Sequence, residues 1–513
     1  MSRSRIARTL AFLALALGAM RATDARAQDA FAEARATVTR LMAADGTPSI
    51  AVAVVKDGRI AWEEAFGLAD SARRVRATHD TPYYLASVTK TLTATAVMRL
   101  VEQGRIRLDA PANDYLPPSG RLWSVGPWSG SQATVRHLLQ HTSGVTTYWN
   151  VCYTDQPGCR VQPIDRAVAR FGALMFPPGE HFDYTNLGYG ILGEIASRAA
   201  QRPFARVLHD EVFLPARMRH ASIGPSPELR ALTAVRYSRA RGPHDSATTS
   251  TPGASGGYAS VDDLARFALL HLGAESETRA LAPATLALMH DTTVSTGDGD
   301  GAYALGWWIE PDHHGYRALF AQGGTDDASA SLLVLPAARV AVAVLANTGT
   351  GITTAVTEAA LDAAIPGYRA RRSSDSVRVA QSSMQRAAPS PPPVPPALVG
   401  GWAGTIRTPH GDTPIRVRVS DARDVDVALD GGAAASLRGV QLAPFDGTGG
   451  RLSGRFRGDL HESDDVGPGP YDVYVELYRR GDALVGLVTT YPTSDAPFGA
   501  RLSYPVTLAP AAR

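Results

Sequence analysis

A proline-rich segment near residue 390 divides this chain of 513 residues into two parts. Residues 371–396 lack the periodicity of a helix or a strand, and the segment ends in the sequence PSPPPVPP. Because proline has a fixed φ angle and no backbone N–H to donate, such a sequence favours a stiff, extended linker. We therefore expect a linker over residues 371–396, a larger domain over residues 28–370 and a smaller domain over residues 397–513.

The first 27 residues have the pattern of a cleavable signal peptide. Three arginines precede an apolar stretch from Leu10 to Met20, and a small-residue cleavage site ends at Ala27. The apolar stretch is shorter than the roughly 20 residues that span a bilayer, and no cysteine follows it to accept a lipid. We therefore expect a signal peptide over residues 1–27, no stable membrane span, and a periplasmic or secreted mature chain that begins near Gln28.

The composition is that of an ordinary soluble globular protein. Hydrophobic residues make up 44% of the chain and charged residues 19%, so the sequence predicts neither disorder nor several membrane spans. The net charge is only +2, and the basic residues are scattered singly rather than gathered in a run. Both features argue against a nucleic-acid partner, and they leave the oligomeric state open.

The only two cysteines of the sequence, Cys152 and Cys159, enclose a short loop. A disulfide between them is chemically reasonable in an exported protein, and a pair of unbonded loop thiols is the alternative. No second cysteine pair or spaced histidine pair accompanies them, so we expect no zinc site there.

The larger domain begins with a β-hairpin and ends with several strands. Alternating residues predict strands over residues 50–55 and 60–66, and apolar positions at helical spacing predict a helix from Val88 to about Gly104. Further helices are expected over residues 136–140, 165–174, 187–199 and 261–272, and further strands over residues 302–309, 316–321, 330–335 and 340–346. This order predicts an α+β fold, in which the first and last strands share one antiparallel sheet flanked by helices and the middle forms a helical subdomain.

The smaller domain consists of short alternating runs that glycine and aspartate separate. Seven strands are expected, over residues 402–407, 415–419, 425–429, 452–457, 471–478, 484–490 and 502–507. The pattern predicts an all-β barrel or sandwich.

Ser87 and Lys90 lie three residues apart at the start of a predicted helix. This spacing puts both side chains on one helix face, where a desolvated lysine can take the proton of a serine nucleophile. Ser-x-x-Lys alone is a weak pattern, and a surface helix is the alternative. However, Lys56 and Lys90 are the only lysines among the 51 basic residues. Because arginine keeps its proton in proteins, a retained lysine is a candidate for proton transfer.

Several segments carry a resemblance to a known family. The segment ASVTKTLTA at residues 86–94 resembles the active-site helix of the serine β-lactamase and penicillin-binding protein superfamily, and PPGEHFDYTNLGY at residues 177–189 resembles the Tyr-x-Asn element of its class C β-lactamase and D-peptidase branch. Further stretches similar to that branch follow the same order: HLLQHTSG at residues 137–144, GGYASVDDLARF at 256–267 and LGW at 305–307. The resemblance covers roughly residues 30–365. It implies a β-lactamase-related serine hydrolase that forms an acyl-enzyme on Ser87 and needs no cofactor.

Tyr184 and Asn186 are the residues of the Tyr-x-Asn element. On an extended loop, both side chains would face one cleft. A phenol next to an ammonium would have a pKa below its usual value and could exchange protons with Ser87 and the leaving group, which would make Tyr184 catalytic. Asn186 offers a donor and an acceptor to an amide of the substrate. A buried tyrosine that only packs against a helix end is the alternative.

The third element of the family departs from its usual pattern. Relatives carry lysine or histidine, then Thr, Ser or Gly, then glycine on a strand beside the site, whereas this sequence has FAQGGTDD. One alignment puts Ala321 at the basic position and another puts Gln322 there, so both lack the cation. Backbone N–H groups of Ser87 and Gly324 can still form an oxyanion hole, and Gln322, Gly323 and Gly324 are expected to bind substrate. The missing cation argues against recognition of the carboxylate shared by penicillins and D-Ala-ended peptides.

Two other patterns are weaker. The sequence GASGG fits the Gly-x-Ser-x-Gly elbow of other hydrolases, with Ser255 as nucleophile, but no apolar strand precedes it, which favours a glycine-rich turn. The chain also contains His137, His141, His313 and His314, with neither a His-Glu-x-x-His pattern nor a carboxylate at ligand spacing. We expect solvated histidines and no metal site.

The sequence therefore predicts an exported serine hydrolase that acts on a small-molecule or peptide substrate through an acyl-enzyme, with Lys90 and Tyr184 moving protons. Because the third-element cation is missing, an esterase or a peptidase is favoured over a dedicated β-lactamase. A non-catalytic ligand- or peptidoglycan-binding member of the same fold is the alternative. The natural substrate and the role of the smaller domain are left open.

Overall fold

A computed structural model describes most of the chain. The described residues are 30–153, 161–239, 242–244, 247–273, 281–297, 300–375, 394–408, 411–443, 450–458, 460, 471–491 and 499–511. Three predicted features lie outside them: the signal peptide over residues 1–27, Cys159, and residues 376–393 of the linker. Residues 371–375 are helical, so the prediction that the linker begins at residue 371 without regular structure is wrong there.

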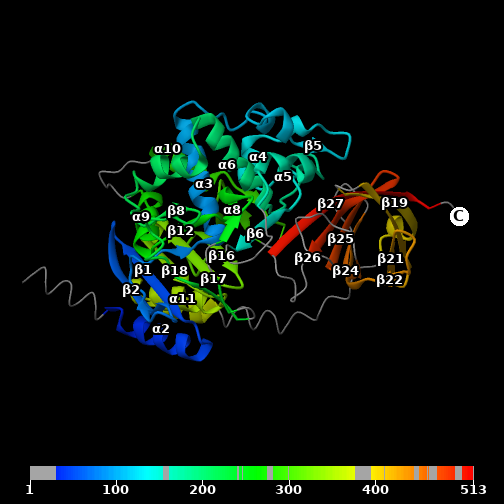
Figure 1. Ribbon diagram of the computed structural model, residues 1–513. Helices are drawn as coiled ribbons and strands as arrows, with labels where there is room; N and C mark the ends of the chain where they lie inside the picture. Colours follow the sequence, from blue (N-terminus) through cyan, green and yellow to red (C-terminus); the bar gives the residue numbers. More distant parts are fainter. Residues whose placement is uncertain are drawn as a thin grey trace, which may run out of the picture.

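The larger part of the molecule is built on a nine-stranded sheet with the order β13-β14-β15-β16-β17-β18-β1-β2-β3 (Figure 1). Its central strands are β1 (Ser49–Lys56), β2 (Arg59–Asp70), β16 (Ala318–Thr325), β17 (Ala328–Leu335) and β18 (Val340–Ala346), and its outer strands are β3 (Val75–Arg76), β13 (Val294–Ser295), β14 (Ala302–Tyr303) and β15 (Trp308–Glu310). β1 pairs antiparallel with β18, with Ile50 opposite Ala346. The first and last strands therefore share one sheet, as the sequence predicts.

One predicted strand is divided by a turn. Residues 302–309 form the two short strands β14 and β15, because the chain turns between them at Gly306, whose φ is 94°. A Cβ atom at Gly306 would lie 2.3 Å from Cβ of Ala94, so the turn also packs tightly against α3 (Thr89–Glu102).

Two helices that the sequence analysis did not predict cover one face of the sheet. α2 (Ala32–Asp45) and α11 (Ile352–Ala364) lie together beneath it in Figure 1. Their apolar side chains form one buried cluster with the strands, which includes Val38, Val54 and Leu361. Alanine and threonine dominate both helices, so their apolar stripes are weak in the sequence.

The other face of the sheet carries α9 and the helical subdomain. The predicted helices are present as α4 (Val135–Leu139), α5 (Ile164–Phe171), α6 (Asn186–Ala200) and α9 (Val261–His271). α5 ends three residues earlier than predicted, because the chain leaves the helix at Gly172 and enters β7 (Ala173–Leu174). Among the described residues, no helix combines the length and apolar character needed to cross a membrane.

The C-terminal part forms a nearly closed barrel of antiparallel strands with the order β22-β21-β20-β19-β27-β26-β25-β24-β23. Its strands are β19 (Gly400–Thr408), β20 (Gly411–Val419), β21 (Val425–Leu429), β22 (Ala435–Ser436), β23 (Arg438–Ala443), β24 (Arg451–Gly458), β25 (Tyr471–Arg480), β26 (Ala483–Tyr491) and β27 (Gly499–Pro510). All seven predicted strands are present, and the structure adds β22 and β23. The predicted fold class is confirmed for both parts.

The barrel is joined to the larger part by a strand of the latter. β6 (Trp149–Tyr153) pairs antiparallel with the start of β27 on one side and with β11 (Ala247–Thr249) on the other. The labels of β6 and β27 mark this junction in Figure 1. Aromatic side chains meet across the same junction: the ring centres of Phe171 and Tyr504 are 5.8 Å apart, and those of Phe176 and Tyr478 are 4.7 Å apart. The barrel is therefore in direct contact with the helical subdomain.

Candidate active site

Ser87 lies at the centre of a short helical turn that leads into α3. The turn, η1 (Ala86–Val88), is a 3-10 helix, and α3 follows directly from Thr89. The residue before Ser87, Ala86, has a φ of 45°, in the left-handed region that costs energy for any residue with a Cβ atom. Ser87 is therefore held on a strained turn at the helix start, and Lys90 lies on the first turn of α3 proper.

Lys90 is buried next to Ser87, with only 2% of its surface exposed. Its Nζ atom lies 3.1 Å from Oγ of Ser87, 2.6 Å from Oδ1 of Asn186 and 3.1 Å from the carbonyl oxygen of Ala254. None of these three partners is a carboxylate, and burial lowers the pKa of Lys90 well below its usual value. A neutral amine has two N–H donors and one lone pair. In its neutral form Lys90 can donate to Asn186 and to the carbonyl of Ala254 and keep its lone pair for the proton of Ser87.

The other lysine has a different setting. Nζ of Lys56 donates a hydrogen bond to the carbonyl oxygen of Ala364 at 2.8 Å, at the end of α11. Lysine near a helix C-terminus satisfies a carbonyl that lacks a partner within the helix. Lys56 thus has a structural contact, while Lys90 alone faces a serine.

Tyr184 is close to both Ser87 and Lys90. Its hydroxyl and the side chain of Ser87 form a hydrogen bond, and Nζ of Lys90 lies 4.6 Å from the centre of its ring. Desolvation raises the pKa of Tyr184, and the hydrogen bond with Ser87 only partly offsets this effect. The prediction that a neighbouring ammonium would lower this pKa is wrong, because the burial of Tyr184 has the larger effect. Tyr184 therefore keeps its proton and can donate it.

The sequence analysis expected Asn186 on an extended loop, and this prediction is wrong. It is the first residue of α6, where the hydroxyl oxygen of Thr185 accepts a hydrogen bond from the backbone N–H of Gly188 at 3.3 Å and caps the helix. The side-chain oxygen of Asn186 accepts a hydrogen bond from Lys90. The described geometry thus gives Asn186 a contact with the lysine, and its side chain also lines the cavity beside Ser87.

The third element lies on β16, next to the nucleophile. A Cβ atom at Gly323 would lie 2.1 Å from the carbonyl oxygen of Leu85 and 2.9 Å from the backbone nitrogen of Ser87, so only glycine allows this approach. Ala321 is buried and Gln322 is exposed, which places Ala321 on the same face of the strand as Gly323. Of the predicted substrate-binding residues on this strand, Gly324 lines the cavity, and Gln322 and Gly323 do not.

A cavity of about 370 Å³ opens beside Ser87. It is lined by Tyr84, Ala86, Ser87, Trp149, Val151, Tyr153, Asn186, Ser255, Gly324, Thr325 and Asp326. Of these described lining residues, none is lysine, arginine or histidine, and Asp326 is acidic. Three of these eleven described residues are aromatic, and none carries a cationic side chain.

The second candidate nucleophile, Ser255, lines the same cavity. It ends the four-residue helix α8 (Pro252–Ser255) instead of opening a helix after a strand, so its backbone does not form a nucleophile elbow. Its side chain hydrogen-bonds with Tyr84. The turn predicted for this glycine-rich stretch is thus a short helix.

A buried arginine behind the cavity was missed by the sequence analysis. Arg236, on β9 (Arg236–Ser238), forms an ion pair of 2.7 Å with Asp327 and lies 4.0 Å from the ring centre of Tyr84. Both members of the pair are almost completely buried. The pair therefore supports the cavity wall at Tyr84 and the turn after Thr325. No motif around Arg236 marks this role, because the partners come together only in the folded chain.

The predicted solvated histidines are partly wrong. His141 is fully buried, accepts a hydrogen bond from the N–H of Thr185 at 3.2 Å, and packs 4.4 Å from the ring of Tyr184. Burial, and to a lesser degree Lys90, lower its pKa well below the usual value, so His141 is neutral. His313 and His314 also differ from the prediction, since the fold brings Glu358 within ligand distance of both.

The cysteine prediction is tested only in part. Cys152 is buried on β6 and is disulfide-bonded, whereas Cys159 lies outside the described residues. β6 also supplies Trp149, Val151 and Tyr153 to the cavity wall.

Comparison with known proteins identifies the family. The beta-lactamase family model matches residues 34–366. Penicillin-binding protein 4 of Amycolatopsis lactamdurans is 30% identical over 316 residues, which cover 59% of this chain and 81% of that protein. Protein flp of Staphylococcus aureus (strain N315) is 26% identical over 310 residues, 58% of this chain and 59% of the relative. The matched region thus spans only about three fifths of the length of the staphylococcal proteins.

Solved structures show the same fold. The octameric penicillin-binding protein homologue from Pyrococcus abyssi has a TM-score of 0.55 and 19% identity, and the match covers 91% of this chain and 99% of that one. A class C beta-lactamase from Rhodobacter sphaeroides has a TM-score of 0.53 and 21% identity over 64% of this chain and 98% of its own. The chain belongs to the beta-lactamase family, within the superfamily of serine β-lactamases and penicillin-binding proteins. This membership supports serine-hydrolase-type activity in general terms.

Proposed function

We propose that this protein is a serine hydrolase that forms an acyl-enzyme on Ser87 and then hydrolyses it. The observation that carries the proposal is the buried amine of Lys90, 3.1 Å from Oγ of Ser87, with no carboxylate among its three polar partners. A desolvated, neutral lysine is a competent base for a serine hydroxyl. Tyr184 adds a protonated phenol that is hydrogen-bonded to the same serine.

The reaction follows from these positions. Oγ of Ser87 attacks the carbonyl carbon of an ester, amide or lactam, and its proton passes to Nζ of Lys90. The backbone N–H groups of Ser87 and Gly324 face the developing oxyanion. As the bond to the leaving group breaks, the hydroxyl of Tyr184 supplies the proton that the leaving group needs and is reprotonated from Lys90. Water then attacks the carbonyl carbon of the acyl-enzyme and gives one proton to the Lys90–Tyr184 pair. The bond between the acyl group and Oγ of Ser87 breaks, and the pair returns that proton to Oγ, which regenerates Ser87.

The cavity favours substrates without a recognition carboxylate. Its described lining residues include the aromatic side chains of Tyr84, Trp149 and Tyr153 and the carboxylate of Asp326. A substrate carboxylate would meet no cationic side chain among these described lining residues. We therefore favour an esterase or a peptidase for neutral or aromatic acyl groups over a dedicated β-lactamase.

The barrel is proposed to shape access to this cavity. β6 supplies Trp149 and Tyr153 to the cavity wall. One edge of β6 pairs with β27 of the barrel. Because β6 is held between β27 and β11, movement of the barrel would move the wall.

We also propose that the chain is exported. The N-terminal pattern motivates this proposal, and the disulfide at Cys152 fits an oxidising compartment. Mass analysis of the mature protein from a periplasmic or culture-medium fraction should give an N-terminus near Gln28. A mature protein that retains residues 1–27 would contradict export by cleavage.

A non-catalytic binding protein is the competing function, since the third-element cation is absent. Reaction with a fluorophosphonate probe, together with turnover of p-nitrophenyl esters, D-Ala peptides and a chromogenic β-lactam, distinguishes the two. Ser87→Ala should abolish labelling and turnover, and Ser255→Ala is the matched control because Ser255 lines the same cavity. No labelling of the folded wild type, or labelling that depends on Ser255, would refute the proposal.

A further inference from the structure

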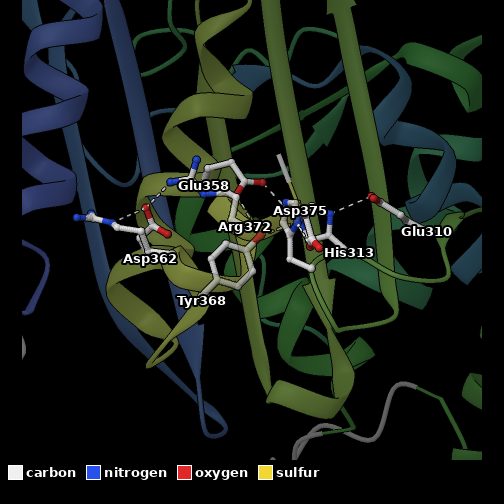
Figure 2. Close-up of polar contacts among 9 residues, drawn as sticks. Glu310, His313, Glu358, Asp362, Tyr368, Arg372 and Asp375 are labelled. Carbon is white, nitrogen blue, oxygen red and sulfur yellow. Dashed lines mark hydrogen bonds and ion pairs between the residues drawn. The ribbon is translucent and has the colours of Figure 1, made fainter. Parts of the chain in front are cut away.

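A cluster of histidines and carboxylates lies next to the start of β16, whereas Gly324 lies near the end of that strand. Figure 2 shows part of this cluster, with His313, Glu310 and Glu358 labelled. His313 and His314 are in the loop between β15 and β16, and Glu358 is on α11. One ligand atom from each of these three residues lies within 4.8 Å of the other two. The sequence analysis rejected a metal here for lack of a carboxylate, and the fold supplies that carboxylate from 44 positions further along the chain.

The distance between two of these atoms suits a metal bond. Nε2 of His313 and Oε1 of Glu358 are 3.4 Å apart. Two ligands that are each about 2.1 Å from a tetrahedral zinc ion lie about 3.4 Å from each other. The two side chains are within ion-pair distance, and their separation also matches the edge of a zinc tetrahedron.

Both rings are oriented by carboxylates on their other nitrogen. Nδ1 of His313 lies 2.9 Å from Oε2 of Glu310, and Nδ1 of His314 lies 2.7 Å from Oδ2 of Asp375. These contacts are drawn in Figure 2 for His313 and Glu310. A metal-bound histidine usually donates its second N–H in this way, which fixes its tautomer and raises its basicity. Because Nδ1 of each ring is engaged, the nitrogen that would bind a metal is Nε2, which in His313 also lies 2.9 Å from the hydroxyl of Tyr368.

Glu358 has one carboxylate oxygen directed toward His313, while its other oxygen has different partners. Its Oε2 atom accepts a hydrogen bond from the hydroxyl of Tyr368 at 3.1 Å and lies 3.3 Å from Nε of Arg372 (Figure 2). The other oxygen, Oε1, is the one that faces His313. The hydroxyl of Tyr368 also lies 2.9 Å from Nε2 of His313, and it would keep its bond to Glu358 when a metal takes that nitrogen.

We propose that Nε2 of His313, Nε2 of His314 and Oε1 of Glu358 bind one Zn²⁺ ion, with water as the fourth ligand. Two neutral imidazoles and one carboxylate form a donor set that zinc prefers. The side chains of His313, His314 and Glu358 are 11%, 23% and 15% exposed, so an ion and a water molecule can reach them. The ion would fasten the loop before β16 to α11, and through Asp375 it would hold the last described residue before position 394.

Metal content and zinc affinity test this site. Untagged full-length protein is freed of metal with a chelator, dialysed and titrated with ZnCl₂ by calorimetry, and zinc is counted by mass spectrometry. We expect one zinc per chain and a rise in Tm on zinc addition. His314→Gln should weaken zinc binding at least tenfold, and Asp375→Asn should weaken it roughly 10- to 100-fold as an outer-shell change. Absence of stoichiometric zinc from folded wild type would overturn the proposal.

Two controls separate this site from others. His209→Gln removes an exposed histidine that pairs only with a neighbouring acid in the described contacts, and it should leave zinc binding unchanged. His290→Gln opens the buried contact of 3.0 Å between His271 and His290, the other close histidine pair among the described residues. Loss of zinc in that variant, with retention in His314→Gln, would place the ion elsewhere and refute the inference. Because these readouts do not involve Ser87, they are independent of the proposed hydrolase activity.

Discussion

Replacing Lys90 with arginine tests whether the buried lysine acts as a base or only as a positive charge. Arginine keeps the charge but cannot give up its proton in a protein. Nζ of Lys90 has three polar partners, which are Ser87, Asn186 and the carbonyl of Ala254. A guanidinium group has five N–H donors, so at least two would lack a partner among these three, in a position that is only 2% exposed.

The size of the effect follows from the role. A lost general acid–base group typically costs about 10²- to 10⁴-fold in rate. We expect kcat/KM of Lys90→Arg to fall about 10³-fold, or about 4 kcal/mol of transition-state stabilisation. Lys90→Ala should fall by a similar factor, because neither side chain can accept the proton of Ser87.

The assay is hydrolysis of a p-nitrophenyl ester by wild type, Lys90→Arg and Lys90→Ala, with thermal unfolding as a check on folding. Lys56→Arg is the matched control, since it makes the same replacement at the only other lysine, which donates to the end of α11. Its activity should stay within about threefold of wild type, since surface substitutions away from a site have small effects. A folded Lys90→Arg enzyme that keeps more than one tenth of the wild-type activity would remove Lys90 from the base role.

Three further predictions follow from the same site and its surroundings. Tyr184→Phe should lower kcat about 10²- to 10⁴-fold, as expected for a lost acid–base group, and an unchanged kcat would reduce Tyr184 to packing. Because burial lowers the pKa of Lys90, the unfolded chain binds a proton that the folded chain does not. The free energy of unfolding should therefore rise with pH between the folded pKa of Lys90 and its unfolded value of about 10.4, and denaturant titrations of Lys90→Met should lack this part of the slope. A chain that ends at Ala388 exposes Phe171 and frees one edge of β6, so we expect a less stable protein that still labels at Ser87 but has altered ester preference. Failure of that shortened chain to fold would show that the two parts share one core.

The sequence predicts those parts of the fold that have strong local patterns. The hairpin of β1 and β2 and all seven predicted barrel strands have alternating apolar residues and clear turns, and they are present. α2 and α11 were not predicted, because their alanine-rich sequences show little apolar periodicity. Their buried faces are defined only by packing against the sheet. The turn at Gly306 was missed for a similar reason, since glycine is required there by the close contact with α3, which exists only in the folded chain.

The candidate site shows the same division. Ser87, Lys90 and Tyr184 could be found from spacing and resemblance, and the structure brings all three into contact. The direction of the Tyr184 pKa shift could not be predicted, because it depends on burial that only the folded chain creates. The ion pair of Arg236 with Asp327 has no local signal, since the partners are 91 positions apart.

The central claim is a covalent intermediate on Ser87, and direct detection of that intermediate tests it best. The protein is mixed with an activated ester, quenched in acid within the first turnover, and analysed by intact-mass and peptide-mapping mass spectrometry. The account predicts one acyl group per chain on the peptide that contains Ser87, and none in Ser87→Ala. Turnover by Ser87→Ala at the wild-type rate, or an acyl group on the Ser255 peptide instead, would contradict it.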